Sequence, residues 1–497
     1  MRRIVVLLAV LSLGRVAAQE RFDRVERRNP WNGGVMAAGI RQDTASRSFA
    51  EVYFVKENGG MTDRSASDDS WNAGARTASI RHLNKISFAG GFSYDYFDGR
   101  NMCGSIFTVP GLYPVDIVEF TPGRKVRETY AFEGALSAML GERWTGGLRV
   151  GFAARNYAKR KDLRHKNTRL DFEFAPSAMY RAGRFAASAA YIVGVDRERV
   201  EAEEIGVSAE SYMAFFDRGL RYGSLQLWES NDLHLSTAGV TGFPVKQTTQ
   251  GAALGMQYGP WHVEAAYRFR QGETGERVAW HEFRTHDLRA DAGWQLIRTD
   301  ESHDVRLGLE WERLDNRENI ISYETVDGVA TPQVHGSAPI FGRRTLDVRA
   351  EYEWTTPRTD LRAGVTATFL DRQSTLMYPY VREQRLHWGT LWADWVQRFG
   401  YWELNVAADF RKGGFRERSE RLSSTAEPGA YPTQLTEWYD YENEYLTADR
   451  LGAGAGVRRH IHGFYIDLSA RYERGFGLRL VERADRVRAV LSVGYNF

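Results

Sequence analysis

Charged side chains of both signs recur at every second position in many segments of this sequence. In residues 345–354, Asp347 and Arg349 alternate with Leu346 and Val348, which is the period of a β-strand. One face of such a strand is polar and the other is apolar. The pattern predicts that the following charged residues share one interior surface: Arg268, Arg289, Asp291, Arg306, Glu310, Asp347, Arg349, Glu351, Arg362, Asp409 and Arg471.

Interspersed acids and bases on an interior surface allow two kinds of chemistry. They can line a polar conduit whose field selects solutes, or they can form ion pairs that brace the wall and fill part of the interior. Both signs occur along the same segments, which argues against strong selectivity for cations or for anions.

The composition indicates what kind of wall carries these charges. The chain has 497 residues, of which 43% are hydrophobic and 13% aromatic, and its mean hydropathy is −0.47. It contains no run of 18 apolar residues, so ordinary transmembrane helices are not expected. A polar average with many aromatic residues is typical of a membrane β-barrel, which has an apolar outer face and a polar lumen. An arginine or lysine facing lipid at the bilayer midplane would cost about 2–4 kcal/mol, so the charged faces should point inward.

The spacing of the connections separates a membrane barrel from a soluble sandwich, which would also alternate. Short turns are expected near residues 141–143, 182–183, 259–260, 299–301, 357–359, 399–400 and 462–463. Longer polar stretches lie between them, near 99–124, 198–247, 315–340 and 414–445. This asymmetry predicts an all-β fold, a closed antiparallel transmembrane β-barrel with short periplasmic turns and long extracellular loops. We expect about 18 strands, with 14–16 as the alternative.

The expected division of the chain begins with a secretory signal at residues 1–18, where Arg2 and Arg3 precede an apolar run. Residues 19–46 would form a periplasmic or lumen-inserted segment, and partial insertion is favoured because an eighteen-strand barrel is wide. Residues 47–497 would form the barrel. Loss of the signal removes three arginines and no acids, so the net charge falls from +2 to −1. A near-neutral chain argues against a nucleic-acid partner.

Two connecting segments have unusual compositions. The stretch 99–124 is too hydrophobic for an idle surface loop, and it could fold inward as a constriction or pack over the barrel mouth. Its candidate constriction residues are Met102, Phe107, Tyr113 and Phe120. A second loop is basic and should face the cell exterior, where it could bind phosphates of lipopolysaccharide or another anionic ligand, or remain a solvated loop. Its residues are Lys159, Arg160, Lys161, Arg164 and Lys166.

Motifs for catalysis and cofactors are weak. His460 and His462 share a strand face, but the sequence shows no third ligand, so no metal site is expected. No nucleophile elbow occurs, and no cofactor is implied. We therefore do not expect an enzyme.

Four segments together resemble an uncharacterised family of outer-membrane β-barrels from Bacteroidota. They are NPWNGGVMAAGIRQDT (29–44), GRNMCGSIF (99–107), GLYPVDIVEFTPGRK (111–125) and NYAKRKDLRHKNTRLDFEF (156–174). The resemblance implies a signal peptide, a barrel and an outer-membrane address, but it assigns no activity and no functional residue.

The last residues, AVLSVGYNF, alternate like a wall strand. This strand should pair with residues 49–55, because a spanning sheet must close. The ending resembles the terminal aromatic strands that direct outer-membrane barrels to the assembly machinery, which assigns that role to Tyr495 and Phe497. The sequence thus predicts a channel or transporter for a small, unidentified solute, in contact with outer-membrane lipid and lipopolysaccharide. The alternative is a non-conducting accessory or structural barrel that partners a transporter or secretion system.

Overall fold

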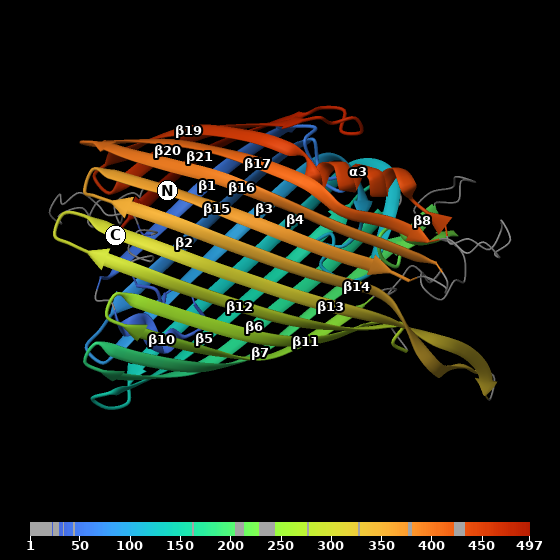
Figure 1. Ribbon diagram of the computed structural model, residues 1–497, viewed down its shortest axis with the longest axis horizontal. Coiled ribbons are helices and arrows are strands. Elements are labelled where there is room, and N and C mark those ends of the chain that lie inside the picture. Colours follow the sequence, from blue (N-terminus) through green and yellow to red (C-terminus); the bar gives the residue numbers. More distant parts are fainter. Residues whose placement is uncertain are drawn as a thin grey trace, which may run out of the picture.

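The structure is a β-barrel built almost entirely from long strands (Figure 1). The computed structural model describes residues 22, 29–32, 34–42, 45–161, 164–203, 213–227, 244–275, 278–326, 329–375, 380–421 and 433–497. The signal expected at residues 1–18 therefore lies outside the described residues. The wall strands are β1 (Arg47–Gly59), β2 (Asp69–His82), β3 (Ile86–Ser105), β4 (Asp116–Met139), β5 (Trp144–Lys159), β6 (Arg164–Ala182), β7 (Phe185–Glu203), β10 (Val245–Tyr258), β11 (Trp261–Thr274), β12 (His281–Ile297), β13 (Ser302–Val326), β14 (Val329–Thr355), β15 (Thr359–Ser374), β16 (Val381–Phe399), β17 (Trp402–Arg421), β19 (Asp449–Ile461), β20 (Phe464–Phe476) and β21 (Asp485–Asn496).

The wall closes as expected. Each of these strands pairs antiparallel with its neighbours in the wall, and β21 returns to β1 with Phe49 opposite Asn496 and Val55 opposite Val490. Beyond this ladder, the amide of Phe497 donates to the Ser48 carbonyl at 2.9 Å, and the Ser48 amide donates to the Phe497 carbonyl at 2.9 Å. The prediction of a closed antiparallel barrel of about 18 strands is confirmed.

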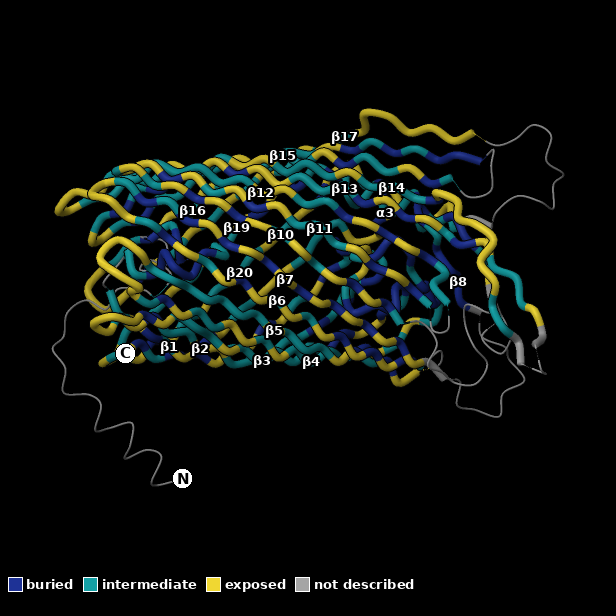
Figure 2. Tube along the Cα trace, turned by 90° about the horizontal axis from the view of Figure 1, so that it is seen from below, coloured by how far each residue is buried: buried dark blue, intermediate teal, exposed yellow. Residues whose placement is uncertain are grey.

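Burial alternates along much of the wall strands (Figure 2), as expected where successive side chains face the outside and the lumen in turn. In β1, Val52 is 57% exposed and Phe54 is 44% exposed, whereas Glu51 between Ala50 and Val52 is 6% exposed. The exposed side chains on the outside are mostly aliphatic and aromatic. Large aromatics are exposed beside the short turns, at Trp144, Trp261 and Trp402. No helix among the described residues is long and apolar enough to cross a membrane.

The two ends of the barrel differ. At one end, which we call the short-turn end, adjacent strands are joined by tight turns such as the β10–β11 turn, which has Gly259 at φ +56°. The start of β1 and the end of β21 lie at this end (Figure 1). The opposite, long-loop end carries the longer connections and the β13–β14 hairpin, whose outermost strand residues extend past the other strands (Figure 1).

Five shorter elements lie inside the wall or at its mouth. Near the long-loop end are β8 (Met213–Asp217), β9 (Tyr222–Leu227), β18 (Thr433–Gln434) and helix α3 (Thr436–Thr447). The 3₁₀ helix η1 (Ala37–Gln42) lies against β3, β4, β5 and β6. Elements within the expected loop stretches 198–247 and 414–445 were not anticipated from the sequence.

Deletion of Phe497 tests the closure of the wall. The deletion removes both backbone hydrogen bonds to Ser48, at an expected cost of about 2 kcal/mol, and it opens the seam between β1 and β21. We expect less folded barrel in the membrane fraction, measured as the band that shifts on heating in gel electrophoresis. Phe497→Tyr keeps the backbone bonds and should retain the wild-type yield. An unchanged yield for the deletion would contradict this role of the seam.

Candidate functional site

The long-loop end of the lumen is covered by chain segments that fold inward. We call these segments the cap: residues 60–68, residues 100–124, the β8–β9 hairpin and α3. The N-terminal residues of β4, 116–119, leave the wall. They pair with β8, and the pairing of β4 with β5 begins only at Lys125. The ladder continues from β8 to β9 and from β9 to β18, which leads into α3. A small second sheet thus extends inward from the wall.

The β8–β9 hairpin reaches the opposite side of the lumen. Its turn contacts β14, where Gly219 lies so close to the Phe341 ring that an added Cβ would stand 2.3 Å from it. Gly219 also has a φ of +122°, which only glycine adopts readily. Arg382 of β16 donates to the Leu220 carbonyl at 2.9 Å. The hairpin therefore connects β4 with β14 and β16.

An apolar cluster holds the 100–124 segment against the inner wall. Ile106, Phe107 and Ile117 pack with Phe216 of β8 and with wall residues such as Phe283. The candidate constriction residues Met102, Phe107 and Tyr113 are buried, and the Phe120 ring lies 6.0 Å from the Trp438 ring of α3. Of the two alternatives for this stretch, the structure places it inward.

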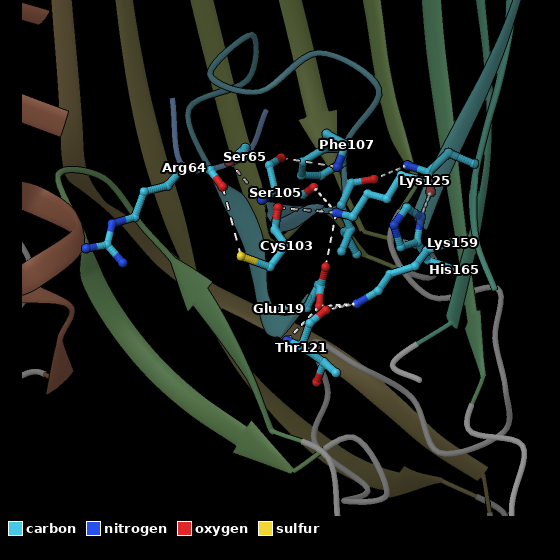
Figure 3. Close-up of polar contacts among 12 residues, drawn as sticks. Arg64, Ser65, Cys103, Ser105, Phe107, Glu119, Thr121, Lys125, Lys159 and His165 are labelled. Carbon is cyan, nitrogen blue, oxygen red and sulfur yellow. Dashed lines mark hydrogen bonds and ion pairs between the residues drawn. The ribbon is translucent and has the colours of Figure 1, made fainter. Parts of the chain in front are cut away.

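A buried ionic cluster also anchors this segment (Figure 3). Lys125 and Lys159 have fully buried side chains, and both contact the buried carboxylate of Glu119. The Nζ–O distances are 3.1 Å for Lys125 and 2.5 Å for Lys159. Lys125 donates to the Ser105 carbonyl at 3.0 Å, and Lys159 donates to the Thr121 carbonyl. Glu119 therefore joins residues 100–124 of the cap to the wall portions of β4 and β5, which begin at Lys125 and end at Lys159.

This cluster corrects the expectation for Lys159. The sequence placed it in a solvated basic loop, but its side chain points into the lumen because Tyr157 and Lys159 occupy inward positions of β5. Lys161 donates to the Pro122 carbonyl at 3.1 Å. Arg160 and Lys166 are exposed, and Arg164 is half-buried.

Helix α3 is fixed by a second buried carboxylate. Glu442 accepts from Arg372 of β15 at 2.7 Å and from Arg221 in the β8–β9 turn at 3.2 Å. Burial would raise the pKa of Glu442, but the two guanidinium groups outweigh it and hold the pKa at about 2. Arg221 also pairs with Asp217 at 3.0 Å. Glu442 thus remains charged and ties α3 to both the hairpin and the wall.

The short-turn end of the lumen is narrowed by residues 29–32 and 34–42. Trp31 is fully buried, and its Nε1 donates to Gln257 of β10 at 2.8 Å. The Ala38 amide donates to Ser177 at 3.0 Å, and Ser137 donates to the Ala38 carbonyl at 3.1 Å. These bonds place the segment against the inner faces of β4, β6 and β10.

Cavities remain along the lumen of the described part of the barrel. The short-turn chamber, with a volume of about 1010 Å³, is lined by Asn29, Pro30, Gly34 and Val35 and by charged wall residues. The middle cavity of about 440 Å³ and the long-loop chamber of about 460 Å³ share Arg343, Arg372 and Glu442 in their linings. The short-turn chamber adjoins the middle cavity, because Arg289 of the former lies 3.7 Å from Glu310 of the latter. The cavities therefore follow one another through the lumen.

All the charged residues expected on the interior surface lie at inward positions of their strands. Five of them line the short-turn chamber: Arg268, Arg289, Asp291, Arg306 and Arg349. Glu310 and Asp347 line the middle cavity. Arg362 pairs with Asp394, and Arg471 pairs with Asp409. Glu351 lies on the inward face of β14, opposite Arg306 of β13.

Several important residues were missed by the sequence analysis. Glu119, Arg221 and Glu442 lie in or beside segments that lack a long run of alternating polar and apolar residues. The sequence therefore does not indicate whether these side chains point into the lumen. Lys125 and Arg127, by contrast, continue the inward positions of β4, and extending that strand toward residue 116 could have found them. The described residues contain no group of three His, Cys, Asp or Glu side chains placed to hold a metal ion.

Glu119→Gln tests the ionic anchor of the cap. It leaves two buried ammonium groups without the carboxylate that both contact, and removing one partner of a buried pair typically costs about 3–5 kcal/mol. We expect a lower urea midpoint for unfolding of the reconstituted barrel. Glu273→Gln breaks an exposed pair with Lys246 and should change stability by less than about 1 kcal/mol. Equal midpoints for the two variants would refute the anchor.

Comparison with solved structures finds outer-membrane proteins at low similarity. The ferric preacinetobactin receptor BauA from Acinetobacter baumannii is 8% identical, with a TM-score of 0.40, over 91% of this chain and 80% of that one. The ferric yersiniabactin uptake receptor FyuA from Yersinia pestis is 8% identical, with a TM-score of 0.42, over 92% and 80%. The outer membrane protein OpdK from Pseudomonas aeruginosa is 9% identical, with a TM-score of 0.33, over 91% and 99%. At this level none of them informs on function.

Comparison by sequence is more specific. No curated protein matches the chain. A family model, described as a family of unknown function (DUF6850), matches residues 37–497, which include all 18 wall strands, the cap and η1. This protein therefore belongs to the DUF6850 family.

Proposed function

We propose that this protein spans the bacterial outer membrane and passes a small polar solute through a gated lumen. The observation that carries the proposal is the row of three cavities inside one closed wall, each lined in part by charged side chains, with a cap that noncovalent contacts hold over the long-loop end. A purely structural barrel has no need of such a row of cavities along its lumen.

The membrane location is supported by the outer surface. A closed barrel leaves no unpaired strand edge, which is a requirement for β-structure in lipid. The outward positions of the strands carry exposed aliphatic and aromatic side chains, with exposed tryptophans beside the short turns. We therefore place outer-membrane lipid around the wall and lipopolysaccharide around its long-loop half, with insertion by the barrel assembly machinery.

The gate would be the cap. Besides the apolar cluster, ion pairs and hydrogen bonds attach it to the wall, such as Glu442 with Arg372 and Thr108 with Glu198, and these polar contacts can be exchanged for water when the cap moves. Residues 29–32 and 34–42 narrow the other end, so both ends would restrict passage. The alternating charges of the wall suit a polar solute and do not favour one sign of inorganic ion.

Bilayer recordings with the purified full chain test this proposal. Replacing residues 108–114 with three glycines removes Tyr113 from the apolar cluster of the cap. We expect a several-fold larger single-channel conductance than for wild type. The matched control replaces residues 321–334 with Asn-Gly, which shortens the β13–β14 hairpin outside the lumen and should leave conductance unchanged.

The opposite result would be equally informative. If neither the wild type nor the cap variant conducts at any voltage while both remain folded barrels, the channel proposal is wrong. The accessory or structural barrel would then be the better account of the filled lumen.

A further inference from the structure

We infer that the long-loop chamber is a binding site for a small organic anion that carries one carboxylate or phosphate group. The inference deepens the proposed function, on which its biological meaning rests, by naming the class of solute. The chamber is enclosed by the cap and by β2, β3, β4, β5, β14, β15 and β21, and its lining includes Ser70, Phe97, Met102, Tyr113, Arg127 and Arg372. Its volume of about 460 Å³ lies within the range of small-molecule sites, roughly 300–1,000 Å³.

Four buried polar atoms in this lining have no hydrogen-bond partner. They are Ser70 Oγ, Tyr113 Oη, Arg127 Nε and Arg372 Nη2. Tyr113 Oη is the least isolated of the four, because the Glu198 carboxylate, which accepts from Thr108 and Asn167, also lies near enough to act as its acceptor. Buried groups of this kind usually have partners, because an unmade hydrogen bond costs about 1–3 kcal/mol. Their concentration in one cavity indicates a missing acceptor-rich occupant.

The chemistry of the free atoms determines what the occupant must offer. Guanidinium N–H groups can only donate, and the two hydroxyl groups can donate as well. Each of the four sites is therefore satisfied by an acceptor, and an acceptor with several lone pairs can serve more than one of them. A carboxylate or phosphate fits this requirement, and its planar or tetrahedral oxygens suit the guanidinium fork.

Charge supports the same assignment. Arg127 forms no ion pair with any carboxylate among the described residues, and its guanidinium lies over the Phe97 ring at 5.2 Å. The strand register adds two cations on the same inner face. Arg155 is diagonal to Arg127 across β4 and β5, and it stands opposite Arg169 of β6. Asp196 and Asp171 pair with Arg169, so Arg127 carries charge that the wall does not neutralise.

The acids in the chamber do not supply that neutralisation. Asp217 and Glu442 are paired with arginines. Asp63 accepts from the Ser65 amide at 2.8 Å, and Asp116 accepts from Ser105 at 2.7 Å. Burial raises the pKa of the Asp63 carboxyl and raises that of Asp116 to about 7, so these two groups oppose the charge of Arg127 less than fully ionised acids would. A single negative charge on the ligand would therefore balance Arg127, and the apolar side chains Met102 and Phe341 would contact its body.

Titration calorimetry of the full chain in detergent tests this site with three probes. They are phenylacetate, phenyl phosphate and the neutral 2-phenylethanol. We expect an anion to bind, the alcohol to bind much more weakly, and Arg127→Gln to weaken anion binding about 10- to 100-fold, as for loss of charged hydrogen bonds. Comparing the two anions shows whether carboxylate or phosphate is preferred. Arg127→Lys should restore part of the affinity.

Two controls make the outcome specific. Arg284→Gln removes one positive charge from an exposed outward position of β12 and should leave binding unchanged. Each variant is first shown to be a folded, heat-modifiable barrel. Wild-type affinity in Arg127→Gln, or equal binding of the alcohol, would overturn the inference.

Bilayer recordings separate this inference from the proposed function. Conductance without binding of either anion would reject the site and leave the channel proposal intact. Anion binding in a protein that never conducts would keep the site and reject the channel.

Discussion

The need to pair every backbone polar group governs this structure. A sheet placed in lipid has no water to satisfy a free edge, so the edges must meet, and here β1 and β21 do so from Phe49 to Gly59 and beyond it at Ser48 and Phe497. Closure fixes the face on which each side chain lies, because the period of a strand is two. It therefore also sends the charged residues inward. The polar lumen is thus a consequence of the same constraint that makes the wall continuous.

A charged lumen creates a second problem, since carboxylates and ammonium groups removed from water need partners. The barrel solves it locally, with short ion pairs between neighbouring strands such as Arg458–Asp467 at 2.8 Å and Arg270–Asp287 at 3.0 Å. In the cap, one carboxylate serves two cations, as the fully buried Glu119 and the partly buried Glu442 do. These shared carboxylates give the cap a defined position without covalent links.

Much of the wall could be predicted from the sequence, because alternation over ten or more residues determines both strand and face. Asp347 and Arg349 were placed inward on this basis, and the turns beside Trp261 and Phe464 were located correctly. The cap could not be predicted in the same way. Strands β8, β9 and β18 are too short for a period to show, and α3 has a polar sequence, TEWYDYENEYLT. Lys159 shows most clearly where prediction from the sequence fails. A run of basic residues indicates a solvated loop, but the position of Lys159 in β5 directs its side chain into the lumen.

The position of the long-loop chamber follows from how the cap is divided. One part, the 100–124 segment with β8, is attached to β4–β7 through Lys125, Lys159 and Glu198. The other part, α3, is attached to β15 through Arg372 and to β16 through Gln384. The chamber lies between them, because its lining takes Tyr113 and Asp116 from the first part and Glu442 from the second. Any opening of the mouth that separates the two parts would therefore divide the chamber. An anion that contacts Tyr113 of the first part and Arg372, which holds Glu442 of the second part, would oppose that separation. Binding of the solute would thus disfavour opening of the mouth, because the bound solute would stabilise the closed position of the cap by its contacts on both sides of the chamber.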